Sequence, residues 1–443
     1  MRTLLVATTL AVMALTACTD ERTAPPAAAQ TQAQPQAQKE TGEASMKAPG
    51  GDGIASMRIT EAQADIELQP SNPDLWSVLA QAWVRKAREG QRERLFSTAE
   101  DAADKALSLR GNHRQALNIK AMVLQQKHRF EELRSLAQTI VKAEPRDAAA
   151  WGLLGDAELE LGSYAAAEQA YQEMIDIYPG IASYSRVAWL RWIHGDVEGA
   201  AQMWDLAIEI SSEKDPEPRA FCLTQKGHLH WFAGQLPAAI RQYNAALLAM
   251  PNHAGALMGR GRARLASGDA AGAVADLEAS FKARRLEETW ALLAHAYRAH
   301  SEPLKADEID RRLAEASDTD DPRSISVYLS ARDLSQDRAL ELALSDAESR
   351  GDLYTQDALA MAHFRKGDLD KAARFASEAL STNPPDPRIL AHAGLIDAAM
   401  GNLPRATERL EAALELNPAF DPALALEVRA ALEASARRDG VTQ

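Results

Sequence analysis

Few residues of this chain combine the types and the spacing that catalysis or metal binding requires. Cys222 is a lone thiol in a helical stretch, where we expect it to be buried and unreactive. His228 and His230 are two positions apart, so they point to nearly opposite sides of a helix and cannot hold one metal ion together. The sequence contains no H-E-x-x-H, P-loop, G-x-S-x-G or C-x-x-C motif. We therefore predict no catalytic residues, no metal site and no cofactor.

An acidic run at Asp318, Asp320 and Asp321 invites comparison with a calcium loop. Its spacing lacks the glutamate that completes such a loop. Helix N-capping within a solvated linker is the interpretation that we favour.

The other cysteine, Cys18, has a covalent chemistry of its own. It ends the motif Leu-Thr-Ala-Cys, behind Arg2 and an apolar run from Leu4 to Ala17 that is too short to span a membrane. The motif resembles a bacterial lipobox, in which the cysteine is acylated and becomes the new N-terminus; the alternative is a plain signal peptide with an accidental cysteine. We expect residues 1–17 to be a lipoprotein signal peptide and the acyl chains on Cys18 to anchor the chain in the membrane. Because Thr19 rather than an acidic residue follows, we expect the outer membrane, with the protein facing the periplasm.

The anchor is followed by a segment without apolar periodicity. Residues 18–57 are rich in Ala, Gln, Pro, Thr and Gly, which predicts a disordered tether, and residues 439–443 are expected to be a disordered tail. The formal net charge of the chain is −14, which disfavours binding to nucleic acid or to anionic lipid surfaces.

The stretch from Asp147 to Gly180 shows how the remaining chain is organised. Two helical patterns, with apolar residues every three to four positions, flank a turn at Gly162. Gly155 and Ala167 are small enough to let the two helices approach closely, and larger aromatic side chains fill the remaining gaps. Such a hairpin cannot bury its apolar face alone, so it needs neighbours of the same kind.

Those neighbours are present, because glycine and proline punctuate the chain at similar intervals. The turn glycines are Gly162, Gly195, Gly234, Gly268, Gly367 and Gly401, and prolines that end repeats are Pro145, Pro179, Pro251, Pro384 and Pro418. Ser301 takes the place of a turn glycine, and a degenerate repeat is expected near Leu334, within residues 322–350.

In the central hairpin, Trp151, Gly155, Ala167, Tyr171 and Pro179 have the spacing of a tetratricopeptide repeat (TPR), and the segment resembles one closely. The resemblance implies an all-α fold, a right-handed α-solenoid of about ten TPR-like helix pairs over residues 58–438.

The resemblance also implies that the first helices of successive pairs line a concave face. Repeating the inner positions of the central hairpin along the chain gives a stripe of aromatic and polar residues, flanked by Arg191 and Phe221. The stripe contains Trp189, Trp192, His228, Trp231 and Phe232. Exposed aromatic residues grouped in this way predict a hot spot for binding a protein or an extended peptide. The alternatives are that the superhelix packs these rings internally, or that the assigned positions are misaligned.

The resulting functional hypothesis is a lipid-anchored scaffold or adaptor that holds an envelope protein, or a segment of one, in its groove. Such a protein could serve a protease or the assembly of a secretion, pilus or polysaccharide-export complex. The alternative is a chaperone or noncatalytic subunit in envelope biogenesis, such as c-type cytochrome maturation. A hydrolase with a degenerate site in residues 286–350 is a remote third possibility. The sequence leaves the partner and the oligomeric state open.

Overall fold

The computed structural model describes residues 54–90, 94–316, 319 and 321–441. The predicted signal peptide, the lipidation site Cys18 and most of the predicted tether lie outside these residues. The first described helix begins at Ile54 and the last ends at Val441. The helical region therefore extends four residues before and three residues after the predicted boundaries of 58 and 438.

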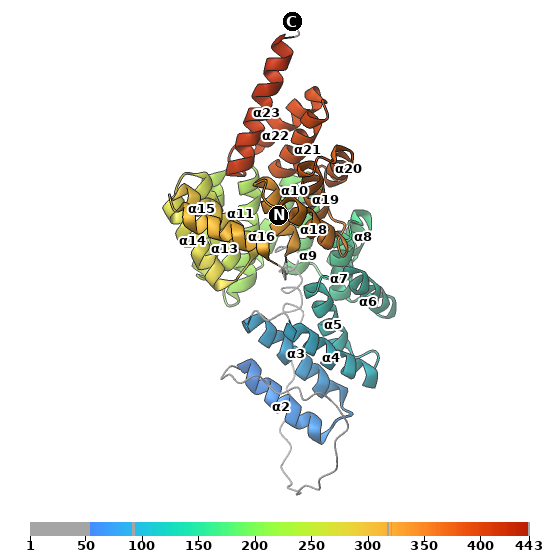
Figure 1. Cartoon of the computed structure of the whole chain (residues 1–443). Coiled ribbons are helices and arrows are strands. Elements are labelled where there is room, and N and C mark those ends of the chain that lie inside the picture. The colour runs from blue at the N-terminus through green and yellow to red at the C-terminus, as the bar shows by residue number, and fades with distance from the viewer. Residues whose placement is uncertain (1–53, 91–93, 317–318, 320, 442–443) are drawn as a thin grey trace. The chain divides into compact units, whose positions relative to one another are not determined.

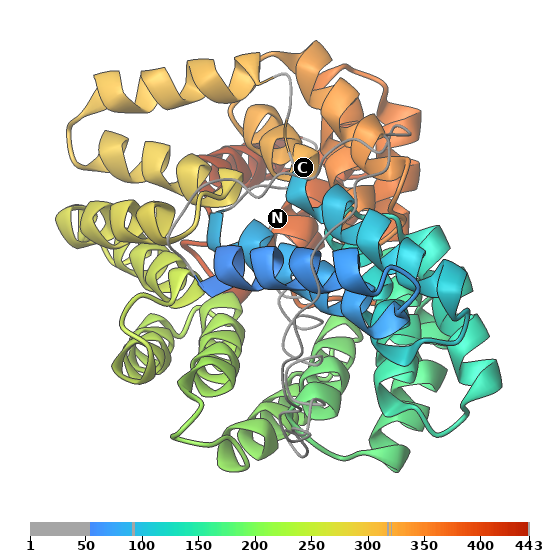
Figure 2. The same ribbon diagram turned by 90° about the horizontal axis from the view of Figure 1, so that it is seen from below.

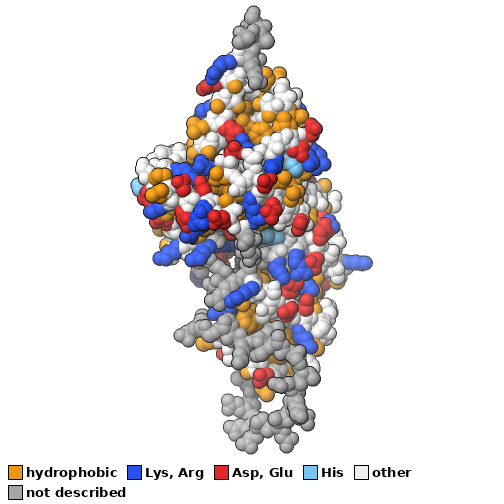
Figure 3. All heavy atoms as spheres, viewed as in Figure 1, with side chains coloured by type: hydrophobic (Ala, Val, Ile, Leu, Met, Phe, Trp, Pro, Cys, Tyr) orange, Lys and Arg blue, Asp and Glu red, His pale blue; other side chains and the backbone are white. Residues whose placement is uncertain are grey.

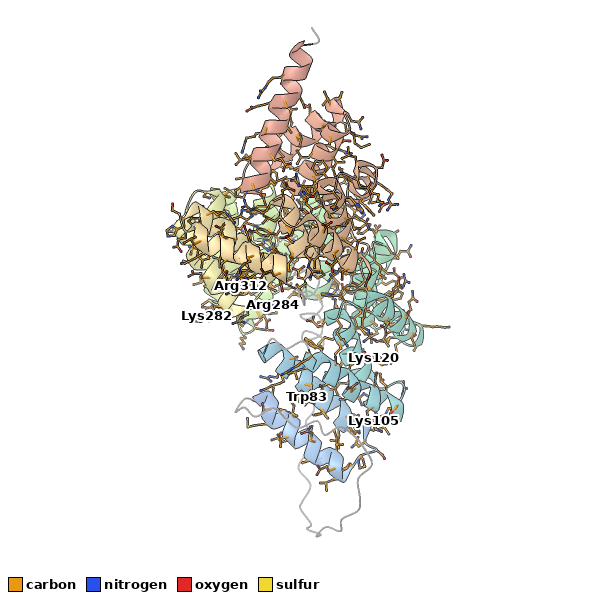
Figure 4. All side chains as sticks on the ribbon, viewed as in Figure 1. Trp83, Lys105, Lys120, Lys282, Arg284 and Arg312 are labelled. Carbon is orange, nitrogen blue, oxygen red and sulfur yellow. The ribbon has the colours of Figure 1, made fainter. Side chains whose placement is uncertain are left out.

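All regular structure in the described residues is helical, and the predicted all-α solenoid is confirmed (Figure 1). The chain divides between residues 127 and 128 into two compact units, which are described separately. The N-terminal unit contains α2 (Ile54–Leu68), α3 (Pro73–Gly90), α4 (Arg94–Leu109) and α5 (Arg114–Gln126). Trp83 of α3, labelled in Figure 4, belongs to the apolar core of this unit and is 2% exposed.

The C-terminal unit contains the remaining eighteen described helices. They are α6 (Phe130–Ala143), α7 (Ala148–Glu160), α8 (Tyr164–Ile177), α9 (Ile181–Ile193), α10 (Val197–Glu209), α11 (Pro216–Phe232), α12 (Leu236–Ala249), α13 (Ala254–Ala266), α14 (Ala270–Ala283), α15 (Glu287–Ala299), α16 (Pro303–Glu315), α17 (Pro322–Ala331), α18 (Gln336–Ala347), α19 (Leu353–Arg365), α20 (Leu369–Ala379), α21 (Pro387–Ala399), α22 (Leu403–Leu416) and α23 (Pro422–Val441). Eight successive antiparallel pairs run from α7/α8 to α21/α22.

The turns between paired helices use backbone conformations that the sequence predicted. All six turn glycines have a positive φ between 67° and 83°, a region that costs glycine little. Ser301, which replaces a turn glycine, also has a positive φ of 62°. The degenerate repeat near Leu334 is confirmed as α17 and α18, with Asp333 and Ser335 on either side of that leucine both at positive φ.

Close approach of the paired helices explains the small residues of the pattern. A Cβ atom on Gly155 would lie 2.3 Å from the Tyr171 ring, so only glycine fits at this position. The same relationship recurs between Gly227 and Tyr243, where the distance would be 2.6 Å. The tyrosine therefore fills the space that the missing side chain leaves, and the hairpin packs without a void.

Helix starts are fixed by acidic N-caps. Asp147, Asp196, Asp269 and Asp321 each accept a hydrogen bond from a backbone N–H in the first turn of the following helix. Asp321 thus has the capping role that we favoured over calcium binding.

The helix pairs of the C-terminal unit follow one another around a circuit, which is visible when this unit is viewed end-on (Figure 2). Its largest apolar core contains residues from α7 to α13 together with residues from α19 to α23. Segments about 190 residues apart therefore share one core. On the outer surface of this unit, acidic and basic side chains are intermixed (Figure 3).

Candidate functional site

The first helices of the pairs form the inner wall of the C-terminal unit, as the resemblance implied. A cavity in this unit is lined by residues of α11, α15, α17 and α21, which are all first helices, and by residues at the start of α23. We call it the inner cavity. The predicted aromatic stripe lies on the same wall, on α9 and α11.

The structure brings the predicted aromatic residues together in one cluster. The ring centroids of Trp189 and Trp192 are 4.9 Å apart, those of Trp192 and Phe232 are 4.5 Å apart, and those of Trp231 and Phe232 are 5.4 Å apart. The guanidinium of Arg262 lies 3.9 Å from the centroid of the Trp231 ring, which is a cation–π contact. The residues obtained by repeating the inner positions of the central hairpin along the sequence therefore lie together.

The exposure that the hot-spot prediction assumed is absent. Trp192 and Trp231 are each 1% exposed, and Phe232 is 4% exposed. Tyr354 of α19 packs on Trp189 with a centroid distance of 6.3 Å, and Leu353 and Phe420 belong to the same core. The prediction of a free aromatic wall is wrong, because the later repeats return to cover it; the alternative of internal packing is confirmed. A role of these residues in partner binding stays a prediction.

His228 is also internal. Its Nδ1 atom lies 2.8 Å from the hydroxyl of Tyr243 and 3.2 Å from Nη2 of Arg262. The side chain therefore belongs to a buried polar group that links α11, α12 and α13.

The two flanking residues lie elsewhere. Phe221 is buried and contacts Trp204 edge to face, with ring centroids 6.0 Å apart. Arg191 is exposed and forms an ion pair with Asp196 at 3.4 Å. Neither residue reaches the inner cavity.

The later repeats contact the earlier ones at a junction that we call the seam. Its contacts include hydrogen bonds that involve backbone groups. The Gly351 amide donates to the Glu160 carbonyl at 2.9 Å, and the Leu353 amide donates to the Tyr164 hydroxyl at 2.7 Å. Further along the chain, the Asn417 side chain, which follows α22, donates to the carbonyl of Trp231 on α11 at 2.7 Å, across 186 residues of sequence. In each of these hydrogen bonds the two partners are separated by nearly the same number of residues, so the superhelix closes on itself in one register.

A network of five buried charged residues lies at the seam. Arg350 Nε is 3.0 Å from Glu160 Oε2, and Arg350 Nη1 is 2.7 Å from Asp346 Oδ1. Arg323 Nη1 is 2.6 Å from Asp352 Oδ2. Three carboxylates thus share two guanidinium groups in an interior of low polarity, where an unbalanced charge is costly.

Burial changes the protonation behaviour of this network. Burial raises the pKa of Glu160 from its ordinary value of 4.5 to about 7, although Arg350 and Arg323 oppose the rise and Asp352 and Asp346 add to it. Burial would also raise the pKa of Asp346, but Arg323 and Arg350 outweigh it and the pKa lies below its ordinary value. Glu160 is therefore the member of the network that titrates near neutral pH.

The space of the inner cavity, counted together with the solvent at its opening, is about 590 Å³. The apolar residues of its lining include Phe232, Leu292, Val327, Phe420 and Leu424. The lining also contains charged and polar groups. They are Glu288, His295, Tyr328, Asp386, Arg388, His392 and Asp421.

Of the residues that line this cavity, only Phe232 was predicted from the sequence to bind a partner. A position in the repeat could have identified a second lining residue: the one six residues before each turn residue. Trp189 and His228 occupy it before Gly195 and Gly234, and the same count before Ser301 gives His295, which lines the cavity. Asp386 and Arg388 lie in the segment that begins α21, for which the repeat pattern gave no functional signal.

Other reactive groups of the described residues are not arranged for chemistry. Cys222 is buried and unpaired, and burial raises the pKa of its thiol to about 12. Within the ranges that the structure describes, no group of three or more His, Cys, Asp or Glu side chains is placed to hold a metal ion. None of the described helices is both long and apolar enough to cross a membrane.

Two segments of the chain match the sequence profile of the tetratricopeptide repeat family, residues 120–180 and 224–285. These two segments of the chain are therefore similar to tetratricopeptide repeats. No curated protein sequence matches it significantly.

Several solved structures are similar. PilW, described as a widely conserved type IV pilus biogenesis factor, is 18% identical, covers 45% of this chain and 93% of its own, and has a TM-score of 0.38. Human IFIT1 in a dimer with m7Gppp-AAAA is 14% identical over 82% of this chain and 85% of its own, with a TM-score of 0.48. A tetratricopeptide repeat protein from Parabacteroides merdae is 16% identical over 60% of this chain and 99% of its own, with a TM-score of 0.33. Neither a function nor a partner follows from these likenesses.

Proposed function

We propose that this chain is a noncatalytic tetratricopeptide repeat scaffold that binds a protein partner through the interior of its C-terminal unit. The observation that carries the proposal is the inner cavity, around which the first helices of four pairs and the start of α23 converge. Its lining combines apolar residues with a few buried polar groups, which is the usual composition of a binding pocket.

The partner in this proposal is an envelope protein or an extended segment of one. Acyl chains on Cys18 would hold the scaffold at the outer membrane, facing the periplasm, and residues 19–53 would act as the tether. Attachment to the same membrane raises the local concentration of the scaffold near its partner, so moderate affinity at the cavity suffices. Assembly of an envelope complex, or delivery of a substrate to a protease, is the role that we assign to such binding.

Site-specific photo-crosslinking in the native membrane tests the binding site. A photoreactive amino acid replaces Ala331, which lines the inner cavity; the matched control replaces Leu248, which is 87% exposed on the second-helix surface of α12. We expect a discrete crosslinked species with one envelope protein from position 331 and not from position 248. Crosslinks from the outer position alone would contradict binding in the interior.

A separate experiment tests the membrane attachment. Incorporation of a labelled fatty acid and partition into the membrane fraction are compared between the natural chain and Cys18→Ala. We expect both to be lost in the variant. Equal labelling of the two chains would rule out lipidation at Cys18 without bearing on binding in the cavity.

A further inference from the structure

Three polar groups that line the inner cavity are almost completely buried. Asp386 and His392 are each 1% exposed, and Glu288 is 3% exposed. They come from α15 and α21 and the residue before it, so two separate helix pairs supply them. Groups buried to this extent are normally satisfied by hydrogen bonds.

Several polar atoms of the lining have no hydrogen-bond partner among the described residues: Oδ2 of Asp386, Nε2 of His392, and Nε and Nη2 of Arg388. The other carboxylate oxygen of Asp386, Oδ1, accepts a hydrogen bond from the backbone N–H of Arg388 at 2.9 Å. Asp386 is in this way the N-cap of α21. Oδ2 is therefore left for another donor.

The tautomer of His392 follows from its neighbour. Its Nδ1 atom lies 2.7 Å from Asp357 Oδ1. Burial alone would raise the pKa of Asp357, but His392 and Arg388 outweigh it and the pKa is lowered, so Asp357 is a carboxylate and accepts a hydrogen bond from Nδ1–H.

The formal charges of the lining favour a cation. Glu288, Asp386 and Asp421 contribute three carboxylates, whereas Arg388 contributes the one guanidinium in the lining. Burial lowers the pKa of His295, so this ring is neutral at pH 7.

Arg388 does not offset this excess. Its Nε lies 3.7 Å from Asp357 and its Nη2 lies 3.8 Å from Asp386, so its charge faces two carboxylates although neither nitrogen makes a hydrogen bond. An additional anion would have to compete with both of them.

We infer that the inner cavity binds a positively charged group on an apolar shaft, such as an ammonium with an alkyl chain. The head would approach Asp386 Oδ2, and the shaft would contact apolar residues of the lining such as Phe232 and Leu424. This inference deepens the proposed function, since it gives the chemistry of the segment that the scaffold accepts. The same chemistry is offered by a lysine side chain of a partner polypeptide and by a free alkyl amine.

Three matched probes test the charge preference: hexylammonium, hexanoate and hexanol, which share a six-carbon shaft. Their binding to the full chain in detergent is measured by isothermal titration calorimetry. We expect hexylammonium to bind at least tenfold more tightly than either of the others. Binding of hexanoate with equal or higher affinity, or binding of none of the three, would overturn the inference.

Asp386→Asn is the informative variant, because asparagine keeps the N-cap and removes the charge. Its control is Asp269→Asn, which makes the same change at the N-cap of α14, outside the cavity. We expect a loss of at least tenfold in hexylammonium affinity from the first variant and none from the second. Equal affinity in both would contradict the assigned head-group site.

Two further arms complete the experiment. Ala331→Phe fills the cavity from α17 and leaves Asp386 unchanged in the sequence. It should abolish hexylammonium binding even if Asp386→Asn fails to fold. Retained binding would place the cation elsewhere. A short apolar peptide with one central lysine is compared with its norleucine analogue. Tighter binding of the lysine peptide than of hexylammonium identifies a polypeptide as the source, and the reverse order identifies a free amine. Crosslinking from position 331 without a charge preference would leave the scaffold proposal intact and remove only this inference.

Discussion

Nε of Arg350 lies 3.0 Å from Oε2 of Glu160, and the two side chains are 1% and 5% exposed although 190 residues separate them. This pair joins α7 to the segment between α18 and α19 and so closes the superhelix. The buried aromatic cluster behind it depends on that closure.

Replacing Arg350 by methionine should destabilise the C-terminal unit. At pH 8, where Glu160 is mostly ionised, the variant leaves a buried carboxylate without its nearest cation, and we expect a loss of about 3 kcal/mol in the free energy of unfolding. Urea denaturation followed by tryptophan fluorescence measures it. Arg311→Met removes an exposed pair with Glu308 and should leave the free energy of unfolding nearly unchanged. Equal losses in the two variants would show that the seam pair has no special role.

Stability should depend on pH through Glu160. Because burial raises the pKa of Glu160 in the folded state from 4.5 to about 7, the folded chain holds this proton more tightly than the unfolded chain does. The contribution to stability is fully present below about pH 4.5 and is lost as the pH rises through about 7, with a total on the order of 3 kcal/mol.

Glu160→Gln should remove this fall in stability between pH 4.5 and 7. Unfolding free energies are measured across that range for the natural chain and the variant. Glu173→Gln, an exposed position on α8, serves as the control and should keep the slope. A slope that survives in Glu160→Gln would assign the titration to another group.

Gly162→Ala should be more damaging than Gly268→Ala. The two residues have similar positive φ values, 77° and 83°, so the conformational cost of alanine is nearly equal. A Cβ atom on Gly162 would lie 2.5 Å from the Gly351 carbonyl oxygen across the seam, whereas one on Gly268 would meet no atom within 4 Å. We expect about 1–3 kcal/mol of additional destabilisation for Gly162→Ala, measured by thermal unfolding. Matching melting temperatures would mean that the seam relaxes freely.

Trp192→Ala should act on stability. Trp192 is 1% exposed, and removing a buried tryptophan costs about 3–5 kcal/mol. Arg191→Ala, on the exposed side of the same helix, should cost less than about 1 kcal/mol. Urea denaturation compares them. A Trp192→Ala variant that keeps full stability would support the exposed hot spot that the structure argues against.

Local features of the fold were predictable because they depend on short-range geometry. The turn glycines, the substitution of Ser301 and the helix pair around Leu334 follow from a repeat length and from the need for positive φ at the turn. The inner-wall position of Trp189, Trp192 and Phe232 follows from the same repeat.

The closure was not predictable in this way. It results from small rotations between successive pairs that accumulate along the array, and no local pattern encodes their sum. Gly351 and Asp352 read as an ordinary loop, although they meet α7 and its turn across the seam. The exposure of the aromatic stripe and the composition of the inner cavity both depend on this sum, and both were missed for that reason.

The bond from the Asn417 side chain to the Trp231 carbonyl has a consequence for folding. In an open array each repeat contacts only its neighbours, so folding can spread from any point and a terminal repeat can be removed with local effect. Here the last repeats complete the environment of the early ones, so removal of a terminal repeat would also uncover residues about 190 positions earlier in the chain. Translation would have to deliver α19 before Tyr354 can cover Trp189, and α22 before Asn417 can reach the Trp231 carbonyl.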